Sequence, residues 1–345
     1  MKTSIPPAHE HPFAQYVRIL GKGKKGTRSL TEDEAYDAML MIMKGEVLDV
    51  QLGAFLMLMR VKEESAEELV GFVKAARQFI EDTQQDLKHL HVDLDWSSYA
   101  GKRRHLPWYL LAIFALANAG YKVFIHGASG HTIDRIYSED VLMALGFPVA
   151  QCDTTAKEQL DSFNFCYFPL QHLCPKLHEI IELRNIMGLR SPVHTLSRLL
   201  NPCDAAVVMQ GIFHPSYRQV HQHAAMALGY SDVAVIKGEA GEIERNPDTE
   251  CLEQSVVANT LVERSWPPMF SKRHVKETQL DTQVIVDVWR RQSTHEYGEA
   301  AAIGTIALAL LAMKKTNTQE QALALSEDIW RSRDLDFIRV RSTKP

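Results

Sequence analysis

The chain has 345 residues, more than one compact domain usually holds, so its length favours two units or one large α/β unit with a smaller one attached. Hydrophobic residues make up 46% of it and charged residues 23%, which excludes a disordered chain because enough apolar surface exists to offset the entropy of ordering. The 38 Lys and Arg residues against 43 Asp and Glu residues give a formal charge of −5. A polyanionic partner must therefore be met by local clusters of positive charge.

Cysteine content and hydropathy indicate the cellular compartment of the protein. The five cysteines are widely spaced and include no Cys-x-x-Cys pair, so they indicate neither zinc nor redox chemistry. The first 13 residues lack the apolar core of a secretory signal. The longest apolar stretch, residues 303–313, is much shorter than the roughly 20 residues that cross a bilayer and predicts a buried helix instead. We expect a cytoplasmic protein with no membrane partner.

The first part of the chain predicts a small helical domain. Two capping boxes, Thr31 with Glu34 and Ser65 with Glu68, mark helix starts ahead of amphipathic segments. Apolar residues at helical spacing predict helices over 13–20, 31–44 and 49–60, and from 65 onward. We place this domain at residues 1–88 and expect part of 175–203 to join it.

From about residue 88 short apolar runs alternate with helical patterns, which is typical of a parallel sheet with right-handed crossovers. Strands are expected in the runs 91–96, 122–127, 163–168, 204–211, 231–238 and 282–289. Helices are expected over 108–119, 138–145, 175–187 and 214–228, with two more between 299 and 330. The predicted fold class is α/β with a small all-helical domain, and the α/β domain spans 89–345.

The first candidate binding site is the glycine-rich loop at 21–26. It matches the pattern Gly-x-Gly-x-x-Gly, but a helix and not a strand is expected before it, so we assign no nucleotide cofactor. The loop offers cations on flexible backbone, which suit phosphates that need no single pose. These cations are Lys22, Lys24, Lys25 and Arg28. A solvated run of charge is the alternative.

The second candidate site follows the first expected strand of the sheet. Lys102, Arg103 and Arg104 lie between that strand and the next helix, where ligands of parallel α/β folds sit. Tyr99 and Trp108 flank these cations, and rings among cations suit single-stranded nucleic acid, whose bases stack on aromatic side chains. Surface cations beside a Trp108 that belongs to the core are the alternative.

The other motifs indicate neither a metal site nor a catalytic reaction. The pair His221 and His223 has no third ligand nearby, so we assign no metal. No Ser-His-Asp arrangement, Gly-x-Ser-x-Gly motif or P-loop is recognisable, so we assign no catalytic residue from motifs.

Several segments resemble anthranilate phosphoribosyltransferase, of glycosyltransferase family 3, which has a nucleoside phosphorylase-like fold. The similar segments are 30–72, KVFIHG (122–127), SEDVLMALGF (138–147), GLRSPVHTLSRLLNP (188–202) and KGEAGEIE (237–244). The resemblance implies a two-domain nucleoside phosphorylase/phosphoribosyltransferase-like fold, with a helical domain hinged to an α/β domain. It also implies head-to-head homodimers formed through the helical domain.

The residues that carry catalysis in that family are not matched here. Its glycine-rich loop for phosphoribosyl pyrophosphate corresponds to residues 97–101, which read Ser-Ser-Tyr-Ala-Gly. Its acidic pair for magnesium corresponds to Ile243 and Glu244, which leaves one carboxylate. Arg198 stands where the family has the proline of a Gly-Pro pair. The comparison implies that anthranilate transfer is lost, and we expect no cofactor and no bound metal.

The departures resemble the YbiB group, a branch of the same fold described as nucleic-acid-binding dimers without the biosynthetic activity. The resemblance implies non-catalytic, sequence-independent binding of single- and double-stranded DNA and of RNA by a homodimer. The residues expected to contact nucleic acid are Lys22, Lys24, Lys25, Arg28, Lys102, Arg103, Arg104, Arg190, Arg198 and Lys237, with Tyr99 and Trp108 as stacking candidates.

Two other functions stay open. The first is a phosphoribosyltransferase or phosphorylase-type glycosyltransferase acting on an unknown aromatic or nucleobase substrate, with Arg184 and Arg190 available for a carboxylate. The second is a scaffold that only dimerises.

Overall fold

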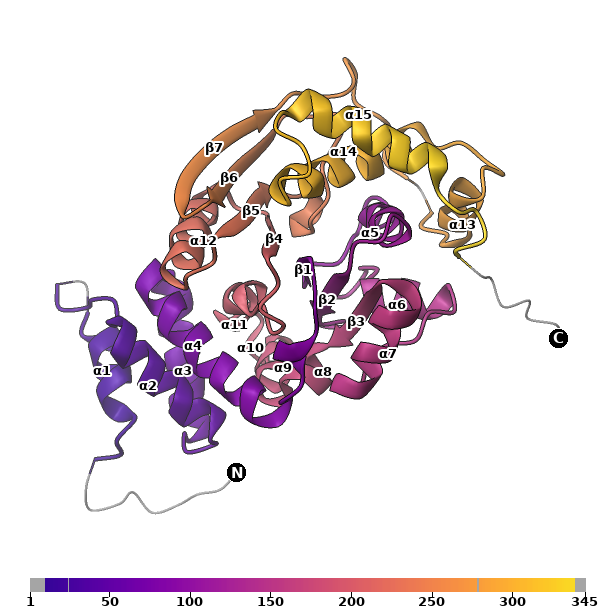
Figure 1. The fold of residues 1–345 in the computed structure, drawn as a ribbon. Coiled ribbons are helices and arrows are strands. Elements are labelled where there is room, and N and C mark those ends of the chain that lie inside the picture. Colours follow the sequence, from indigo (N-terminus) through magenta and orange to yellow (C-terminus); the bar gives the residue numbers. More distant parts are fainter. Residues whose placement is uncertain (1–9, 24, 278, 339–345) are drawn as a thin grey trace.

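The computed structural model describes residues 10–338 except for positions 24 and 278. The beginning of the chain forms a bundle of helices beside a twisted sheet, and the rest builds the sheet and the helices that cover it (Figure 1). The bundle consists of α1 (Ala14–Gly21), α2 (Glu32–Met43), α3 (Asp49–Lys62) and α4 (Ala66–Thr83). The helices predicted for this part of the chain are confirmed.

Both predicted capping boxes are present. The Thr31 hydroxyl accepts a hydrogen bond from the Glu34 amide at the start of α2, and α4 begins with the equivalent pair. The buried Glu68 carboxylate also accepts from the Leu30 amide at 2.8 Å and from the Lys62 ammonium group at 2.7 Å. One carboxylate therefore ties the start of α4 to the segment before α2 and to the end of α3.

The sheet has seven strands in the described part of the chain, in the order β3-β2-β1-β4-β5-β6-β7. The first five strands along the chain pair in parallel, and β6 and β7 are antiparallel. Their bounds are β1 (Leu94–Ser98), β2 (Val123–Gly127), β3 (Phe165–Pro169), β4 (Val207–Ile212), β5 (Asp232–Lys237), β6 (Cys251–Val257) and β7 (Thr260–Trp266). The strand order reverses between β1 and β4, and open α/β sheets bind ligands beyond the carboxyl ends of the strands at such a point.

Helices connect and cover these strands. On the way to β4 the chain forms η1 (Leu87–His89), α5 (Tyr109–Asn118), α6 (Ser138–Ala144), α7 (Asp153–Phe163), α8 (Leu170–Leu173), α9 (Pro175–Glu182), α10 (Arg184–Met187), α11 (Val193–Leu196) and η2 (Ser197–Leu199). After β4 it forms α12 (Pro215–Ala227), η3 (Glu239–Gly241), α13 (Gln283–Trp289), α14 (Glu296–Ala312) and α15 (Gln319–Ser332).

The structure corrects two expectations about the sheet. The run 282–289 is the helix α13 and not a strand, because its buried positions, Ile285, Val286, Val288 and Trp289, follow helical spacing. The antiparallel hairpin β6–β7 was not predicted. Its two-residue turn, Ala258 and Asn259, has positive φ at both positions but lacks the Asn-Gly pair that usually signals such a turn.

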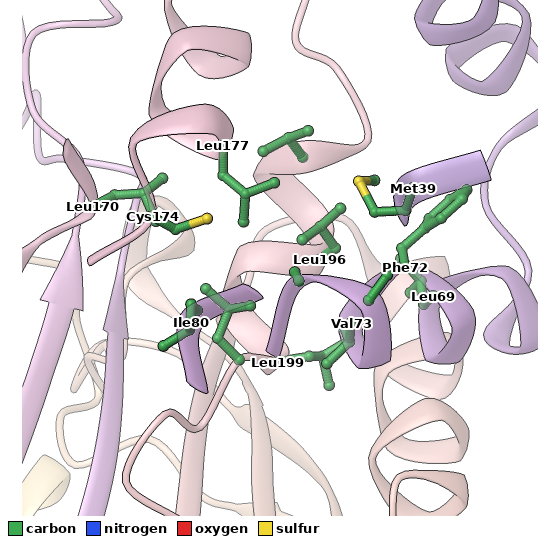
Figure 2. Close-up of a cluster of buried hydrophobic side chains, with 14 of the residues drawn as sticks. Met39, Leu69, Phe72, Val73, Ile80, Leu170, Cys174, Leu177, Leu196 and Leu199 are labelled. Atoms are coloured by element: carbon green, nitrogen blue, oxygen red, sulfur yellow. The ribbon is translucent and has the colours of Figure 1, made fainter. Parts of the chain in front are cut away.

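Two cores lie on opposite faces of the sheet. The first joins the helical bundle to the segment from α8 to η2, and Figure 2 shows Phe72 and Val73 of α4 in one cluster with Leu177, Leu196 and Leu199. The second holds α5, α13, α14 and α15 against the other face. The predicted burial of the apolar run 303–313 is confirmed, since α14 lies in this core. None of the described helices has the length and apolarity needed to cross a membrane.

Close packing of α2 on α4 gives a test of the bundle. A Cβ atom on Gly71 would lie 2.7 Å from the Tyr36 amide nitrogen and 2.8 Å from the Ala35 Cβ atom, so Gly71→Ala forces the helices apart. We expect a loss of about 1–3 kcal/mol in the free energy of unfolding. Gly53→Ala is the control, because Gly53 in α3 has no atom within 4 Å of an added Cβ, and we expect it to gain about 0.5–1 kcal/mol. Urea denaturation measures both, and equal effects would contradict the packing argument.

Candidate ligand-binding cleft

A buried carboxylate occupies the loop that follows β1. Glu242 Oε1 accepts hydrogen bonds from the backbone amides of Ala100 and Gly101 at 2.6 and 2.7 Å. These amides are the donors that a loop of this kind offers to an anion. An anionic group of the protein itself is therefore already bound where the resemblance places the pyrophosphate.

A second internal ion pair closes the same loop. The Lys102 ammonium group donates to Glu244 at 2.6 Å, and both side chains are fully buried. The other oxygen of Glu244 accepts from the Tyr109 amide at the start of α5, at 3.0 Å. This carboxylate thus neutralises a buried cation and satisfies a helix amide, so it is not available to a metal ion.

Small residues allow the segment 239–244 to reach this position. A Cβ atom on Gly211 of β4 would lie 2.7 Å from the Ile243 amide nitrogen, so only glycine permits the segment to pack on the strand. Burial raises the pKa of Glu242 and of Glu244, and the hydrogen bonds and the cations Arg198 and Lys102 oppose that shift. The residues at this loop do not fit magnesium and phosphoribosyl pyrophosphate, because their donors and acceptors are used internally.

Next to this loop the structure forms a pocket rich in arginine, which we call the arginine pocket. It is a cavity of about 100 Å³ between α3, the segment from α10 to η2, and the carboxyl end of β4. Its lining residues are Arg60, Arg190, Ser191, His194, Thr195, Arg198, Gly211, Ile212, Phe213, His214, Tyr217 and His221. Two buried polar atoms of the lining, Ser191 Oγ and His194 Nε2, have no hydrogen-bond partner among the described residues. A polar ligand would satisfy them.

The charge of the pocket is strongly positive. The pKa of Arg190 is lowered to about 10, first by burial and then by repulsion from the guanidinium groups of Arg198, Arg135 and Arg184. Burial first, and then repulsion from Arg190, Arg184 and Arg198, lowers the pKa of His131 to about 3. This imidazole stays neutral at neutral pH, so the positive charge of the cleft comes from arginines.

Neutral acceptors hold most of these guanidinium groups. Arg198 donates to the carbonyl oxygens of Gly211 at 3.1 Å and of His194, and it lies 5.9 Å from the centre of the Tyr99 ring. Arg135 donates to the carbonyls of Ala100 and Gly101 at 2.8 and 3.0 Å, and Arg184 donates to the carbonyl of His131. Carbonyl oxygens satisfy these donors without cancelling their charge.

Burial contradicts the predicted role of three residues that were expected to contact nucleic acid. Lys102 is buried in its ion pair with Glu244 and reaches no phosphate. Tyr99 is buried, with its hydroxyl 2.7 Å from His126 Nδ1. Trp108 is buried, and its Nε1 atom donates to a carboxylate at 3.0 Å. Neither ring offers a face to a base, because each fills the core beside the loop.

The other predicted cations are in varied positions. Arg190 and Arg198 line the arginine pocket, and Arg103, Arg104 and Lys237 are exposed. In the N-terminal loop Lys22 and Lys25 are exposed, and Lys24 lies outside the described residues. Arg28 is exposed but forms a bidentate pair with Glu34 at 2.6 and 2.7 Å, which lowers the pKa of that carboxyl to about 2. Its charge is therefore already compensated.

Several residues of the cleft were not predicted from the sequence. The sequence places Arg60 only within an expected helix, and Phe213 directly follows a buried strand. That position is the usable signal, since parallel strands present ligand-binding residues just beyond their carboxyl ends. No signal pointed to Glu242, which becomes an internal ligand only through its contact with a loop far away in the sequence. Among the described residues no group of three or more His, Cys, Asp or Glu side chains is placed to hold a metal ion.

Comparison with known families supports the two-domain description. The model for the helical bundle domain of the glycosyl transferase family matches residues 15–80. The model for the a/b domain of the same family matches residues 110–332. These matches cover both units of the chain, and the expected two-domain fold is confirmed.

Relatives of this chain include uncharacterized proteins as well as enzymes. An uncharacterized protein of Aquifex aeolicus is 28% identical over 244 residues, which are 70% of this chain and 72% of that protein. Uncharacterized protein YbiB of Escherichia coli is 27% identical over 242 residues, 68% of this chain and 73% of that protein. Anthranilate phosphoribosyltransferase of Ignicoccus hospitalis is 31% identical over 232 residues, 66% of each chain.

Solved structures show the same fold. The anthranilate phosphoribosyltransferase of Thermus thermophilus superposes with a TM-score of 0.76 at 19% identity, covering 96% of this chain and 100% of that one. The yeast enzyme in complex with PRPP and Mg gives a TM-score of 0.75 at 16% identity, covering 96% of both chains. At these identities the likeness shows the fold and not the activity.

The buried pair of Lys102 and Glu244 gives a second test. Lys102→Met leaves the Glu244 carboxylate buried without its cation, so we expect a loss of about 3–5 kcal/mol in the free energy of unfolding. The double variant Lys102→Met with Glu244→Gln removes both charges and keeps an acceptor for the Tyr109 amide, so it should recover much of the loss. Thermal and urea denaturation compare the two. A single variant as stable as the wild type would show that Lys102 is not buried in its ion pair.

Proposed function

We propose that this chain, which belongs to the glycosyl transferase family of helical bundle and a/b domains, binds nucleic acid through its phosphates without catalysing glycosyl transfer. The arginine pocket is the observation that carries the proposal. It brings Arg60, Arg190 and Arg198 together at the carboxyl end of β4, in a cleft between the two domains. Guanidinium groups match phosphate oxygens with paired N–H donors, so they are the side chains best suited to this ligand.

The state of these charges supports an anionic ligand. After burial, the largest effects that lower the pKa of Arg190 come from other arginines, and no ion pair in the described part of the chain includes Arg190. Mutual repulsion raises the free energy of the unliganded cleft, and a bound phosphate relieves that repulsion. Binding therefore gains electrostatic free energy without first breaking an internal ion pair at Arg190.

Exposed cations extend the phosphate-binding surface in the proposal. Lys237 ends β5 and pairs in register with Ile212, so it lies beside the mouth of the arginine pocket. Arg103 and Arg104 are exposed on the loop after β1. Phosphate contacts of this kind carry no base information, so we propose sequence-independent binding of single- and double-stranded DNA and of RNA.

A homodimer in the cytoplasm completes the proposal. We infer that two chains associate through their helical domains, as the family resemblance implies, and α3 leaves Val50 and Val61 exposed, by 77% and 83%, on that domain. Two copies of the arginine pocket would then act on one polyanion, and each would add phosphate contacts to the same complex.

The salt dependence of binding tests the proposal. If a dimer neutralises roughly 6–10 phosphates, affinity falls by about 10³ to 10⁵ between 50 and 200 mM salt. Arg190→Gln removes one contact in each subunit, so it should weaken binding equally for all sequences and reduce the slope of log K against log salt by about 2 for the dimer. Fluorescence anisotropy with labelled DNA and RNA measures both.

Arg331→Gln is the control for this measurement, because Arg331 is 70% exposed on α15, a helix that packs in the second core and not at the arginine pocket. It should leave the affinity and the slope unchanged. A wild-type protein with no salt dependence, or equal effects of the two variants, would contradict phosphate binding in the arginine pocket.

Glycosyl transfer is the second candidate function. Family membership favours it, and Arg184 and Arg190 could receive the carboxylate of an acceptor. The internal contacts of Glu242 and Glu244 oppose it, because the amides of Ala100 and Gly101 are taken and the second carboxylate is paired with a lysine. A donor would have to displace a buried carboxylate from two charge-assisted hydrogen bonds.

Calorimetry separates the two functions. When phosphoribosyl pyrophosphate is added to the wild-type protein at millimolar concentration, we expect magnesium to add no saturable heat, because Glu242 occupies the loop amides. The binding of labelled DNA by the same preparation is the control for a folded protein. Saturable binding of phosphoribosyl pyrophosphate that depends on magnesium, or formation of a ribosylated product, would overturn the non-catalytic proposal.

A further inference from the structure

We propose that the Phe213 ring is a stacking surface for an unpaired base, so that the cleft prefers single-stranded over duplex nucleic acid. The inference rests on the proposed function and names the form of nucleic acid that the arginine pocket selects. It replaces Tyr99 and Trp108, both buried, with a ring that is open to a ligand.

The exposure of Phe213 is unusual for this chain. Its side chain is 60% exposed, and among the described residues it is the one Phe, Tyr or Trp side chain in the exposed class. A single exposed apolar side chain is normal on a protein surface, so the position of Phe213 carries the argument together with its exposure. Phe213 lines the arginine pocket, so this exposed ring shares a pocket with Arg190 and Arg198.

The backbone and a neighbouring ring fix the position of Phe213. It follows Ile212, the last residue of β4, which pairs in register with Lys237 at the end of β5. The His214 ring meets Phe213 edge-on, with centroids 5.0 Å apart and planes at 90°. A ring on a strand end is held more rigidly than one on a long loop, so less side-chain entropy is lost when a base stacks on it.

The arginine pocket is large enough for the phosphate group of a nucleotide but not for its nucleoside. Its volume of about 100 Å³ is far below that of a pocket built for a whole nucleotide and leaves room for a phosphate group. Pockets that enclose a whole small molecule hold about 300 Å³ or more, so a nucleoside stays outside. With the phosphate among Arg60, Arg190 and Arg198, the attached base lies at the rim, where Phe213 is. Lys237 stands beside the same rim for the next phosphate.

A duplex cannot use this surface equally well. Its bases are paired and stacked on one another, so a base reaches Phe213 only if it leaves the helix at a cost in free energy. A single strand presents bases that are already unpaired, and stacking on an aromatic side chain tolerates any base because every base has a π face. The pocket supplies the phosphate contact in both cases, and the ring adds affinity only for the single strand.

Anisotropy with three labelled probes tests this inference. The probes are an oligothymidylate of about 12 nucleotides, a strand of equal length in which abasic sites replace the bases, and a duplex of equal length. Phe213→Ala should weaken binding of the oligothymidylate by roughly 5- to 150-fold, and leave the abasic strand and the duplex unchanged. The slope of log K against log salt should not change, since Phe213 carries no charge. Phe213→Trp should restore the affinity.

Val275→Ala is the matched control, since Val275 is 90% exposed and does not line the arginine pocket. It should leave all three affinities unchanged. An unchanged affinity of Phe213→Ala for the oligothymidylate, or an equal loss on all three probes, would overturn the stacking role while leaving phosphate binding intact. A wild-type protein that binds none of the probes would instead contradict the proposed function itself. Circular dichroism melting confirms that each variant is folded.

Discussion

The carboxylate of Glu242 on the amides of Ala100 and Gly101 is the contact on which the cleft depends. It places a carboxylate of the chain itself on the backbone amides of the loop that follows β1. The loop is consequently closed, and its carbonyl oxygens turn towards Arg135. The donors that remain for a ligand anion lie in the arginine pocket at the end of β4.

The arginine pocket stays electropositive because of how its donors are satisfied. Arg198 is buried, and a buried cation normally needs a carboxylate or becomes very costly. Here the Gly211 carbonyl and the Tyr99 ring receive the guanidinium, and the Glu242 carboxylate opposes the lowering of its pKa by burial. These partners stabilise the group while leaving a positive field at the surface of the pocket. Arg190 has no such set of acceptors among the described residues, so it is the group with most to gain from a phosphate.

The sequence predicted the fold well because its signals are local. Capping residues and apolar periodicity depend on near neighbours, and they located the bundle helices and the five parallel strands. The site was predicted less well, because it depends on contacts between distant segments. Lys102 looks like a surface cation until Glu244, 142 positions away, is placed beside it. Phe213 and Arg60 belong to one pocket only after α3 has docked against the end of β4.

Net charge is a weak guide to the partner of this protein, and the pairing of each cation is a better one. Arg28 and Lys102 both count towards the total, yet a carboxylate compensates each of them. The arginines of the cleft have carbonyl oxygens as their main acceptors, so their charge acts on the surroundings. Screening confines such interactions to about 8 Å at physiological salt, so carboxylates on distant faces do not cancel them. A chain with a formal charge of −5 can therefore present a cationic cleft to a polyanion.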